Sequence, residues 1–130
     1  MERIAEFIES KYTGKVVEVG VGRQTEVAEY LGSCDGIEVT VTDIDTEAGE
    51  KVPEKIEFVA DDVTDPDMRV YDGASVIYSV RPPYELHSAL KEIAEAVGTD
   101  LLVVPLADET PRHGFELLNY EGVVIYRYSS

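Results

Sequence analysis

Residues 16–22, which read Val-Val-Glu-Val-Gly-Val-Gly, constrain the fold of this chain more than any other segment. The valines predict a buried β-strand that runs directly into a glycine loop. Gly20 and Gly22 have no Cβ, so the backbone there can turn sharply and come close to a ligand. Glu18 is costly in a strand that is buried on both faces unless its carboxylate has a partner. We therefore expect Glu18 to contact a cationic or amine-bearing ligand beside the glycine loop.

Strands and helices alternate along the rest of the chain. Apolar patterns predict strands at residues 15–19, 38–42, 56–60, 74–80 and 101–104, and a terminal hairpin at residues 115–119 and 123–128. Helical patterns occupy residues 3–11, 25–31 and 85–97, whereas residues 45–55 and 106–114 predict no full helix. This alternation predicts one α/β domain over residues 1–130, with a Rossmann-like, mostly parallel sheet, flanking helices and a C-terminal antiparallel hairpin.

The chain is strongly acidic, with 27 Asp and Glu residues against 11 Lys and Arg residues and a formal net charge of −16. Nucleic acids and anionic membranes are bound through Lys and Arg, so this balance argues against both as partners. No apolar run approaches the ~20 residues that span a membrane. The single cysteine, Cys34, is typical of a reducing cytoplasm. We therefore expect a cytoplasmic protein with a small-molecule ligand and no metal centre, and the oligomeric state stays open.

Each of the first three predicted strands brings an acidic residue to the same edge of the sheet. Glu18 lies in the first strand, Asp43 follows the second, and Asp61 and Asp62 follow the third. Ligands bind at the carboxyl edge of such sheets, where the strand order switches. Asp43 stands 21 positions after Gly22, close to the ~20-residue spacing of an acid that binds ribose hydroxyls. Asp62, with Asp61 as the open alternative, would accept a hydrogen bond from an amine such as adenine N6.

With Glu18-x-Gly20-x-Gly22, Asp43 and Asp62, the chain resembles the S-adenosylmethionine-dependent methyltransferases of the Rossmann-like class, over roughly residues 15–105. The resemblance implies that Glu18, Gly20 and Gly22 pack against the methionine part of the cofactor. It also implies that Asp43 binds the ribose and that Asp62 binds the adenine. The whole chain is similar to uncharacterised protein family 0146, a small archaeal family, including its Arg-Pro-Pro segment and short C-terminal hairpin. This second resemblance implies the fold and no activity.

The chain departs from the methyltransferase pattern in several places. Gln24 occupies the position of the third loop glycine, so the chain lacks that glycine. The helices that usually follow the second and fifth strands are reduced or missing. A nicotinamide-binding fingerprint, Gly-x-Gly-x-x-Gly, fits less well because Thr25 stands at its last position and because it requires no acid at Glu18.

Residues 80–84, Val-Arg-Pro-Pro-Tyr, follow the fourth predicted strand. In the methyltransferases that this chain resembles, this loop faces the transferred methyl group, and some enzymes that methylate amines have Asn or Asp where Arg81 stands here. Arg81 can only donate hydrogen bonds, so it suits a carboxylate or phosphate on a substrate, or an ion pair with nearby acids. Tyr84 would stack on a ligand or cover the start of the helix, and we expect His87 on the surface of that helix.

Two hypotheses follow for the function. The first is binding of S-adenosylmethionine with methyl transfer to a small acceptor, without an assigned catalytic residue. The second is a non-catalytic domain of the same fold that binds a nucleotide-type ligand, such as NAD, or a protein partner. The matching positions Glu18, Gly20, Gly22, Asp43 and Asp62 favour the first, and the lack of a segment to bind an acceptor favours the second.

Overall fold

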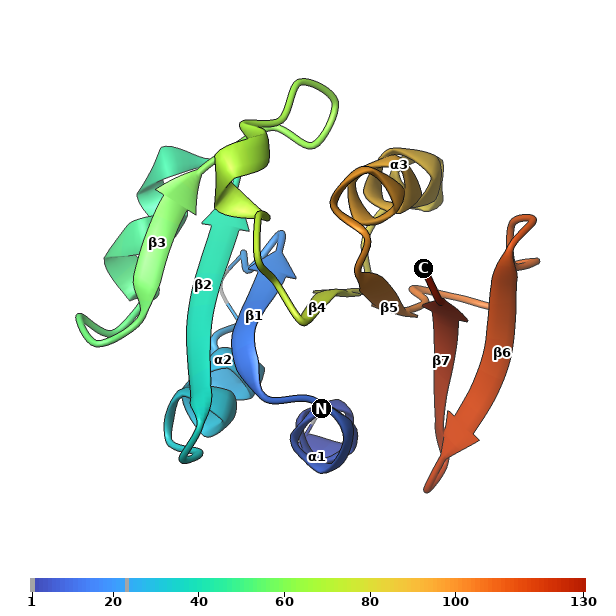
Figure 1. The fold of residues 1–130 in the computed structure, drawn as a ribbon, viewed down its shortest axis with the longest axis horizontal. Coiled ribbons are helices and arrows are strands. Elements are labelled where there is room, and N and C mark those ends of the chain that lie inside the picture. The colour runs from blue at the N-terminus through green and yellow to red at the C-terminus, as the bar shows by residue number, and fades with distance from the viewer. Residues whose placement is uncertain (1, 23) are drawn as a thin grey trace.

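The computed structural model describes residues 2–22 and 24–130 and has a seven-stranded sheet at its centre, in the order β3-β2-β1-β4-β5-β7-β6 (Figure 1). The strands are β1 (Gly14–Val19), β2 (Ile37–Asp43), β3 (Glu57–Ala60), β4 (Val76–Val80), β5 (Asp100–Val104), β6 (Phe115–Tyr120) and β7 (Val123–Tyr128). Neighbouring strands from β3 to β5 are parallel, and β7 is antiparallel to both β5 and β6. The predicted α/β fold is confirmed.

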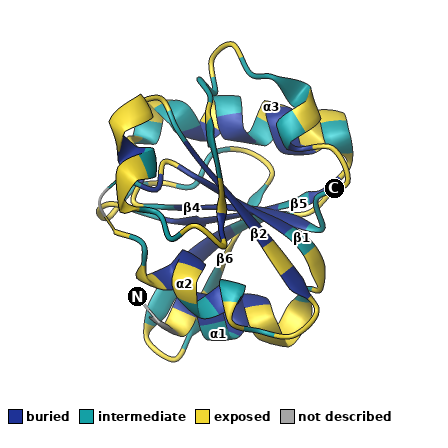
Figure 2. Ribbon diagram, turned by 90° about the vertical axis from the view of Figure 1, so that its left-hand side faces the viewer, coloured by how far each residue is buried: buried dark blue, intermediate teal, exposed yellow. Residues whose placement is uncertain are grey.

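Helices cover both faces of the sheet. On one face lie α1 (Glu2–Lys11) and α2 (Glu26–Gly32), and on the other lies α3 (His87–Val97) (Figures 1 and 2). Successive side chains of a strand point to opposite faces, so the alternation within β1 and β4 separates two apolar cores. Val16 and Tyr78 belong to the core under α1 and α2, whereas Val17 and Ile77 belong to the core under α3.

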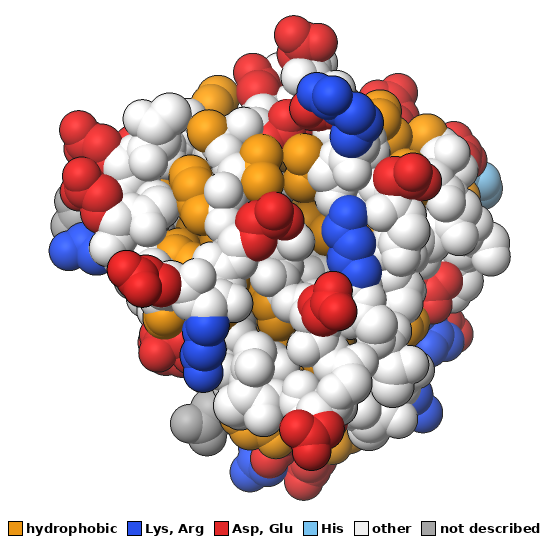
Figure 3. Space-filling view, turned by 60° about the vertical axis from the view of Figure 1, so that its left-hand side comes forward, with side chains coloured by type: hydrophobic (Ala, Val, Ile, Leu, Met, Phe, Trp, Pro, Cys, Tyr) orange, Lys and Arg blue, Asp and Glu red, His pale blue; other side chains and the backbone are white. Residues whose placement is uncertain are grey.

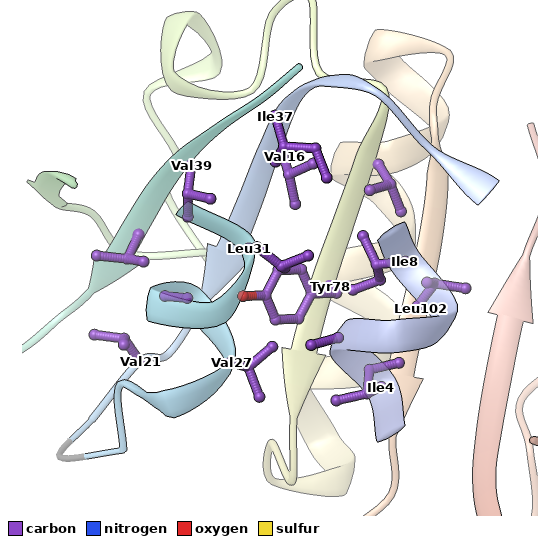
Figure 4. Packing of buried hydrophobic residues seen from close by; sticks show 14 of the residues in the cluster. Ile4, Ile8, Val16, Val21, Val27, Leu31, Ile37, Val39, Tyr78 and Leu102 are labelled. Atoms are coloured by element: carbon purple, nitrogen blue, oxygen red, sulfur yellow. The ribbon is translucent and has the colours of Figure 1, made fainter. Parts of the chain in front are cut away.

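Tyr78 is the largest side chain at the centre of the first core. It is fully buried, and its ring lies between Leu31 and Val27 of α2 and the side chains of α1, including Ile8 (Figure 4). A phenol in such a place needs a hydrogen-bond partner for its hydroxyl. That requirement links this core to Glu18, the acidic residue of β1.

The links between strands are shorter than in a fully helical α/β protein. The segment after β2 forms only the 3-10 helix η1 (Thr46–Lys51), as the broken pattern there predicts, and η2 (Met68–Val70) precedes β4. The helix expected at residues 85–97 starts with the 3-10 turn η3 (Tyr84–Leu86) and becomes α-helical at His87. The expectation that His87 lies on the surface is wrong, because its side chain is 0% exposed.

The C-terminal hairpin is confirmed, with β6 and β7 joined at Glu121 and Gly122. Both residues have positive φ angles, 49° and 90°, which two-residue hairpin turns of type I′ require. Residues 105–114, which we name the strap, connect β5 to β6 without helix or strand. The strap carries the chain past the place that β7 later fills, so that β6 forms the outer edge of the sheet.

The acidic residues are spread over the surface. On the face shown in Figure 3, carboxylates are spread from edge to edge, several of them beside Lys or Arg side chains, and apolar side chains gather in its upper part. This distribution is that of a solvated acidic surface and not of an acidic tail for one basic partner.

Candidate functional site

The strand order reverses beside β1. The chain moves from β1 outward to β2 and β3 and then returns to the other side of β1 with β4, which makes the carboxyl ends of β1 and β4 the expected place for a ligand. Two pockets open there and share Gly20. The glycine-loop pocket, of about 210 Å³, is lined by residues that include Glu18, Gly20, Gly22, Val27 and Arg81. The Asp43 pocket, of about 320 Å³, is lined by residues that include Val19, Gly20, Asp43, Ile44, Asp62 and Leu86.

The glycine loop is held against the end of β2. The N–H groups of Gly20 and Val21 both donate to the carbonyl of Thr42, at 2.9 and 3.1 Å. Gly20 and Gly22 have φ angles of +75° and +56°, in the left-handed region that favours glycine. A Cβ at either position would meet no heavy atom within 4 Å. The two glycines therefore leave open space at the pockets, and backbone conformation selects them independently of packing.

Glu18 lies where β1 meets the glycine loop and is 2% exposed. Its Oε1 accepts a hydrogen bond of 2.6 Å from the hydroxyl of Tyr78 on β4. The pKa of Glu18 is raised to about 7, chiefly by burial; the Tyr78 hydrogen bond lowers it, and the negative charges of Glu26 and Asp43 add to the rise. Burial and the neighbouring carboxylate also raise the pKa of Tyr78 well above its ordinary value. A cationic group in the pocket would favour the ionised form of Glu18.

Asp43 links the end of β2 to the glycine loop. Its Oδ2 accepts from the N–H of Gly22 at 2.8 Å, and its Oδ1 accepts from the N–H of Asp45 at 2.9 Å. A carboxylate has about four acceptor positions, so each oxygen keeps one lone pair for a ligand. The structure thus gives Asp43 a part in shaping the loop that its sequence spacing did not indicate.

Asp61 and Asp62 both line the Asp43 pocket but have different hydrogen-bond partners. Asp61 accepts from the hydroxyl of Tyr71 at 2.6 Å with Oδ2 and from the N–H of Asp67 at 2.9 Å with Oδ1. Asp62 accepts from the N–H and hydroxyl of Thr64, at 2.9 and 2.7 Å, with Oδ1 alone. These bonds lower the pKa of Asp62. Because the Oδ2 of Asp62 has no partner among the described residues, Asp62 has more capacity for a ligand than Asp61.

Arg81 and Tyr84, the two residues expected on the substrate side, have separate surroundings. Arg81 is exposed and lines the glycine-loop pocket. Tyr84 donates to the carbonyl of Thr110 at 2.7 Å, and the guanidinium of Arg112 lies 4.3 Å from its ring centre. The hydroxyl and one ring face of Tyr84 are thus occupied by the strap, and its contacts fit the role of covering the helix start.

His87 lies in a polar cluster beneath the strap that the sequence did not reveal. Its Nε2 is 4.0 Å from Oε1 of Glu109, and the rings of Tyr84 and Tyr126 lie within 6.4 Å of the imidazole centre. Within residues 2–22 and 24–130, both imidazole nitrogens, Glu109 Oε1 and Arg112 Nε are buried without a hydrogen-bond partner. Burial lowers the pKa of His87, against the raising effect of Glu109. The apolar pattern of the surrounding helix did not predict that His87 is buried.

Tyr78 is the other functional neighbour that sequence reasoning missed. It stands in a run of buried residues in β4 and has the character of an ordinary core aromatic there. Its register opposite Glu18 becomes known only once β4 is placed beside β1. In the described part of the chain, no cluster of three or more His, Cys, Asp or Glu residues is arranged to hold a metal ion. The same residues contain no helix that is long and apolar enough to cross a membrane.

The whole chain, residues 1–130, matches the model of uncharacterised protein family UPF0146. The chain belongs to this family. A UPF0146 protein from Archaeoglobus fulgidus is 45% identical over 126 residues, which cover 97% of this chain and 92% of that protein. The family resemblance inferred from the sequence is therefore confirmed.

Solved structures extend the likeness of this UPF0146 chain to methyltransferases. A putative S-adenosyl-L-methionine-dependent methyltransferase from Methanococcus maripaludis aligns over 98% of this chain and 84% of its own, with a TM-score of 0.73 and 13% identity. A TehB-like SAM-dependent methyltransferase from Corynebacterium glutamicum aligns over 98% and 87%, with a TM-score of 0.71 and 17% identity. At these identities the likeness establishes the methyltransferase-like fold alone.

Proposed function

We propose that this protein binds S-adenosylmethionine across Gly20 and transfers its methyl group to a small acceptor. The observation that carries the proposal is the pair of pockets that share Gly20 at the reversal of strand order. In this arrangement the methionine part lies in the glycine-loop pocket beside Glu18, and the nucleoside lies in the Asp43 pocket. The methyltransferase-like structures support this proposal through the fold.

The chemistry of the two pockets matches the two halves of this ligand. The glycine-loop pocket has the buried carboxylate of Glu18 for an ammonium group. The Asp43 pocket combines apolar walls, including Ile44 and Leu86, with Asp43 and Asp62. Apolar walls suit the faces of an adenine ring, while carboxylates accept hydrogen bonds from ribose hydroxyls and from an exocyclic amine.

Methyl transfer from a sulfonium is an in-line displacement that depends on positioning and on exclusion of water. It forms a bond between the acceptor atom and the methyl carbon while the bond from sulfur to that carbon breaks. The bonding pair stays on sulfur, which becomes a neutral thioether. The described residues therefore have to bind and orient the donor, and a fixed nucleophile–base pair is not required.

A second candidate is a non-catalytic domain that binds a nucleotide-type ligand, such as NAD, or a protein partner. The contacts of Tyr84 favour it, because the strap already occupies the side chain that would face an acceptor. The two candidates differ in whether the protein transfers a methyl group and in which ligand it binds. The proposed location is the cytoplasm, the proposed ligand is a small molecule, and the net charge of −16 weighs against nucleic acid.

Calorimetric titration with S-adenosylmethionine and S-adenosylhomocysteine, with NAD as the competitor, tests the proposal. We expect the two adenosyl compounds to bind and to raise thermal stability; a ligand at 100 times its Kd stabilises a protein by about 2.7 kcal/mol. Binding of NAD alone would favour the second candidate, and absence of any heat or stabilisation with all three compounds would overturn both small-molecule readings. Incubation with methyl-labelled donor and extracted small molecules then separates transfer from binding.

A further inference from the structure

Arg81 and Arg112 are the described arginines without a carboxylate partner, and Arg112 lies instead over the ring of Tyr84, 4.3 Å from its centre. Arg3, Arg69 and Arg127 each form an ion pair with a neighbouring acid, at 3.1, 2.9 and 2.7 Å. Among residues 2–22 and 24–130, no carboxylate lies within ion-pair distance of Arg81, although the chain has 27 acidic residues. An unpaired guanidinium at the edge of a pocket is available for an anionic group of a ligand.

The backbone at Arg81 is held in an unusual conformation. Its φ angle is +56°, in the left-handed region that residues other than glycine seldom adopt. The N–H of Arg81 donates to the carbonyl of Val104 on β5 at 2.7 Å, and Pro82 follows directly in the sequence. The hydrogen bond fixes the residue at the carboxyl end of β4, where its side chain lines the glycine-loop pocket. Strained residues of this kind gather at ligand sites because the surrounding structure maintains them.

The glycine-loop pocket presents groups of opposite charge. Its acids are the buried Glu18 and the exposed Glu26, and Arg81 is the basic residue among the described lining residues. Val21, Val27 and Val80 supply apolar surface in the same pocket. A simple anion would be repelled by Glu18, and a simple cation by Arg81. The ligand group that satisfies both is a zwitterion on a short aliphatic chain, which is the structure of an α-amino acid end.

We infer that Arg81 binds the α-carboxylate of the donor's amino-acid end while Glu18 accepts from its ammonium group. This inference rests on the proposed function, since it assigns the methionine part of the donor to this pocket. It moves Arg81 from the acceptor side, where the sequence placed it, to the donor side. The planar guanidinium can hold a carboxylate through two parallel hydrogen bonds, which a lysine ammonium cannot reproduce.

Two adenosine compounds that differ at the amino-acid end test the inference. S-adenosylhomocysteine carries the ammonium and carboxylate groups, and 5′-methylthioadenosine carries neither. We expect the wild-type protein to bind S-adenosylhomocysteine tighter by about tenfold or more, since a charge-assisted bidentate contact is worth at least ~1.4 kcal/mol. Arg81→Gln should remove most of that preference and leave the affinity for 5′-methylthioadenosine within about twofold of wild type. Arg81→Lys should restore part of the preference.

Other outcomes separate the possible failures. Arg69→Gln, which removes a paired arginine, is the matched control and should preserve both affinities. Equal weakening of both compounds by Arg81→Gln, with an unchanged melting temperature, would overturn the carboxylate assignment. So would retention of the full preference, or its loss instead on replacing Arg23, the residue that follows Gly22 in the sequence, with Gln. If neither compound binds the wild-type protein, the proposed function fails together with the inference.

Discussion

The hydroxyl of Tyr78 donates a 2.6 Å hydrogen bond to Oε1 of Glu18, and the two residues are direct neighbours across β4 and β1 although 60 positions separate them in the chain. We expect Tyr78→Phe to reduce the free energy of unfolding by about 1–3 kcal/mol, because the buried carboxylate loses its donor. The loss should be larger at pH 8, where Glu18 is ionised, than at pH 5. Urea denaturation at both pH values measures the difference, and equal losses would show that the hydrogen bond does not depend on the charge of Glu18.

Glu18 gives the protein a characteristic pH dependence of stability. Its pKa is raised from 4.5 to about 7 in the folded state, so the folded state binds the proton more tightly than the unfolded state. The resulting stabilisation is complete below about pH 4.5 and is lost as the pH rises through 7, by about 3 kcal/mol at most. Glu18→Gln should flatten this part of the curve in denaturant titrations from pH 5 to 8. Glu38→Gln removes an exposed carboxylate from β2 and controls for the change in net charge; the same flattening in that variant would contradict the assignment to Glu18.

The glycine loop can be probed by adding a single methyl group. Gly20→Ala places a Cβ in space that the two pockets share, at a φ angle of +75°. We expect a loss of roughly 1 kcal/mol in stability from the left-handed backbone and a loss of adenosyl-ligand binding by at least about tenfold. Gly36→Ala introduces the same kind of strain, at +82° with no atom within 4 Å of its Cβ, away from both pockets. Comparable loss of binding in the two variants would mean that strain alone, and not pocket filling, reduces affinity.

Asp43 should affect both loop geometry and ligand binding. Asp43→Ala leaves the N–H groups of Gly22 and Asp45 without their carboxylate acceptor, and we expect a cost of about 1–3 kcal/mol together with loss of ligand binding. Asp45→Ala removes the cap of η1, in which Oδ1 of Asp45 accepts from the N–H of Glu47, at a cost of about 1 kcal/mol. Thermal shift with and without ligand distinguishes them, since only Asp43→Ala should lose the ligand-induced shift.

His87 should be dispensable for stability near neutral pH. His87→Phe replaces two buried, unpartnered nitrogens with a ring of similar shape, so we expect a change within about 1 kcal/mol at pH 7. The folded pKa of His87 lies below its ordinary value of 6.5, so its contribution is complete above pH 6.5 and is lost as the pH falls below it. The variant should therefore lose less stability than wild type between pH 6.5 and 5, measured by thermal denaturation. A large destabilisation at pH 7 would indicate a hydrogen bond to His87 that ordered water completes.

The sequence predicted the sheet well because its strongest signals are local. The apolar strands and the terminal hairpin each depend on patterns within a few residues, and they lie within two residues of where those patterns placed them. The glycine loop also has a local cause, because Gly20 and Gly22 adopt positive φ angles where the loop turns against Thr42.

The site was less predictable because its details depend on contacts between distant segments. Spacing alone placed Asp43 at the correct sheet edge but could not show that Gly22 binds one of its oxygens. His87 shares a helical pattern with exposed residues, and its burial results from the strap, which has no periodic signal of its own. The partner of Glu18 is Tyr78 of β4, and it could be identified only once the topology placed β4 beside β1.

The position of β7 between β5 and β6 has a consequence for synthesis of the protein. β6 leaves the ribosome before β7, yet β7 is the strand that joins it to the sheet. Until residues 123–128 emerge, β6 has no hydrogen-bonded neighbour, and β5 remains an open edge with unpaired backbone groups. A nascent chain can thus form the parallel core from β1 to β5 and the pockets at Gly20 before its last two strands assemble together.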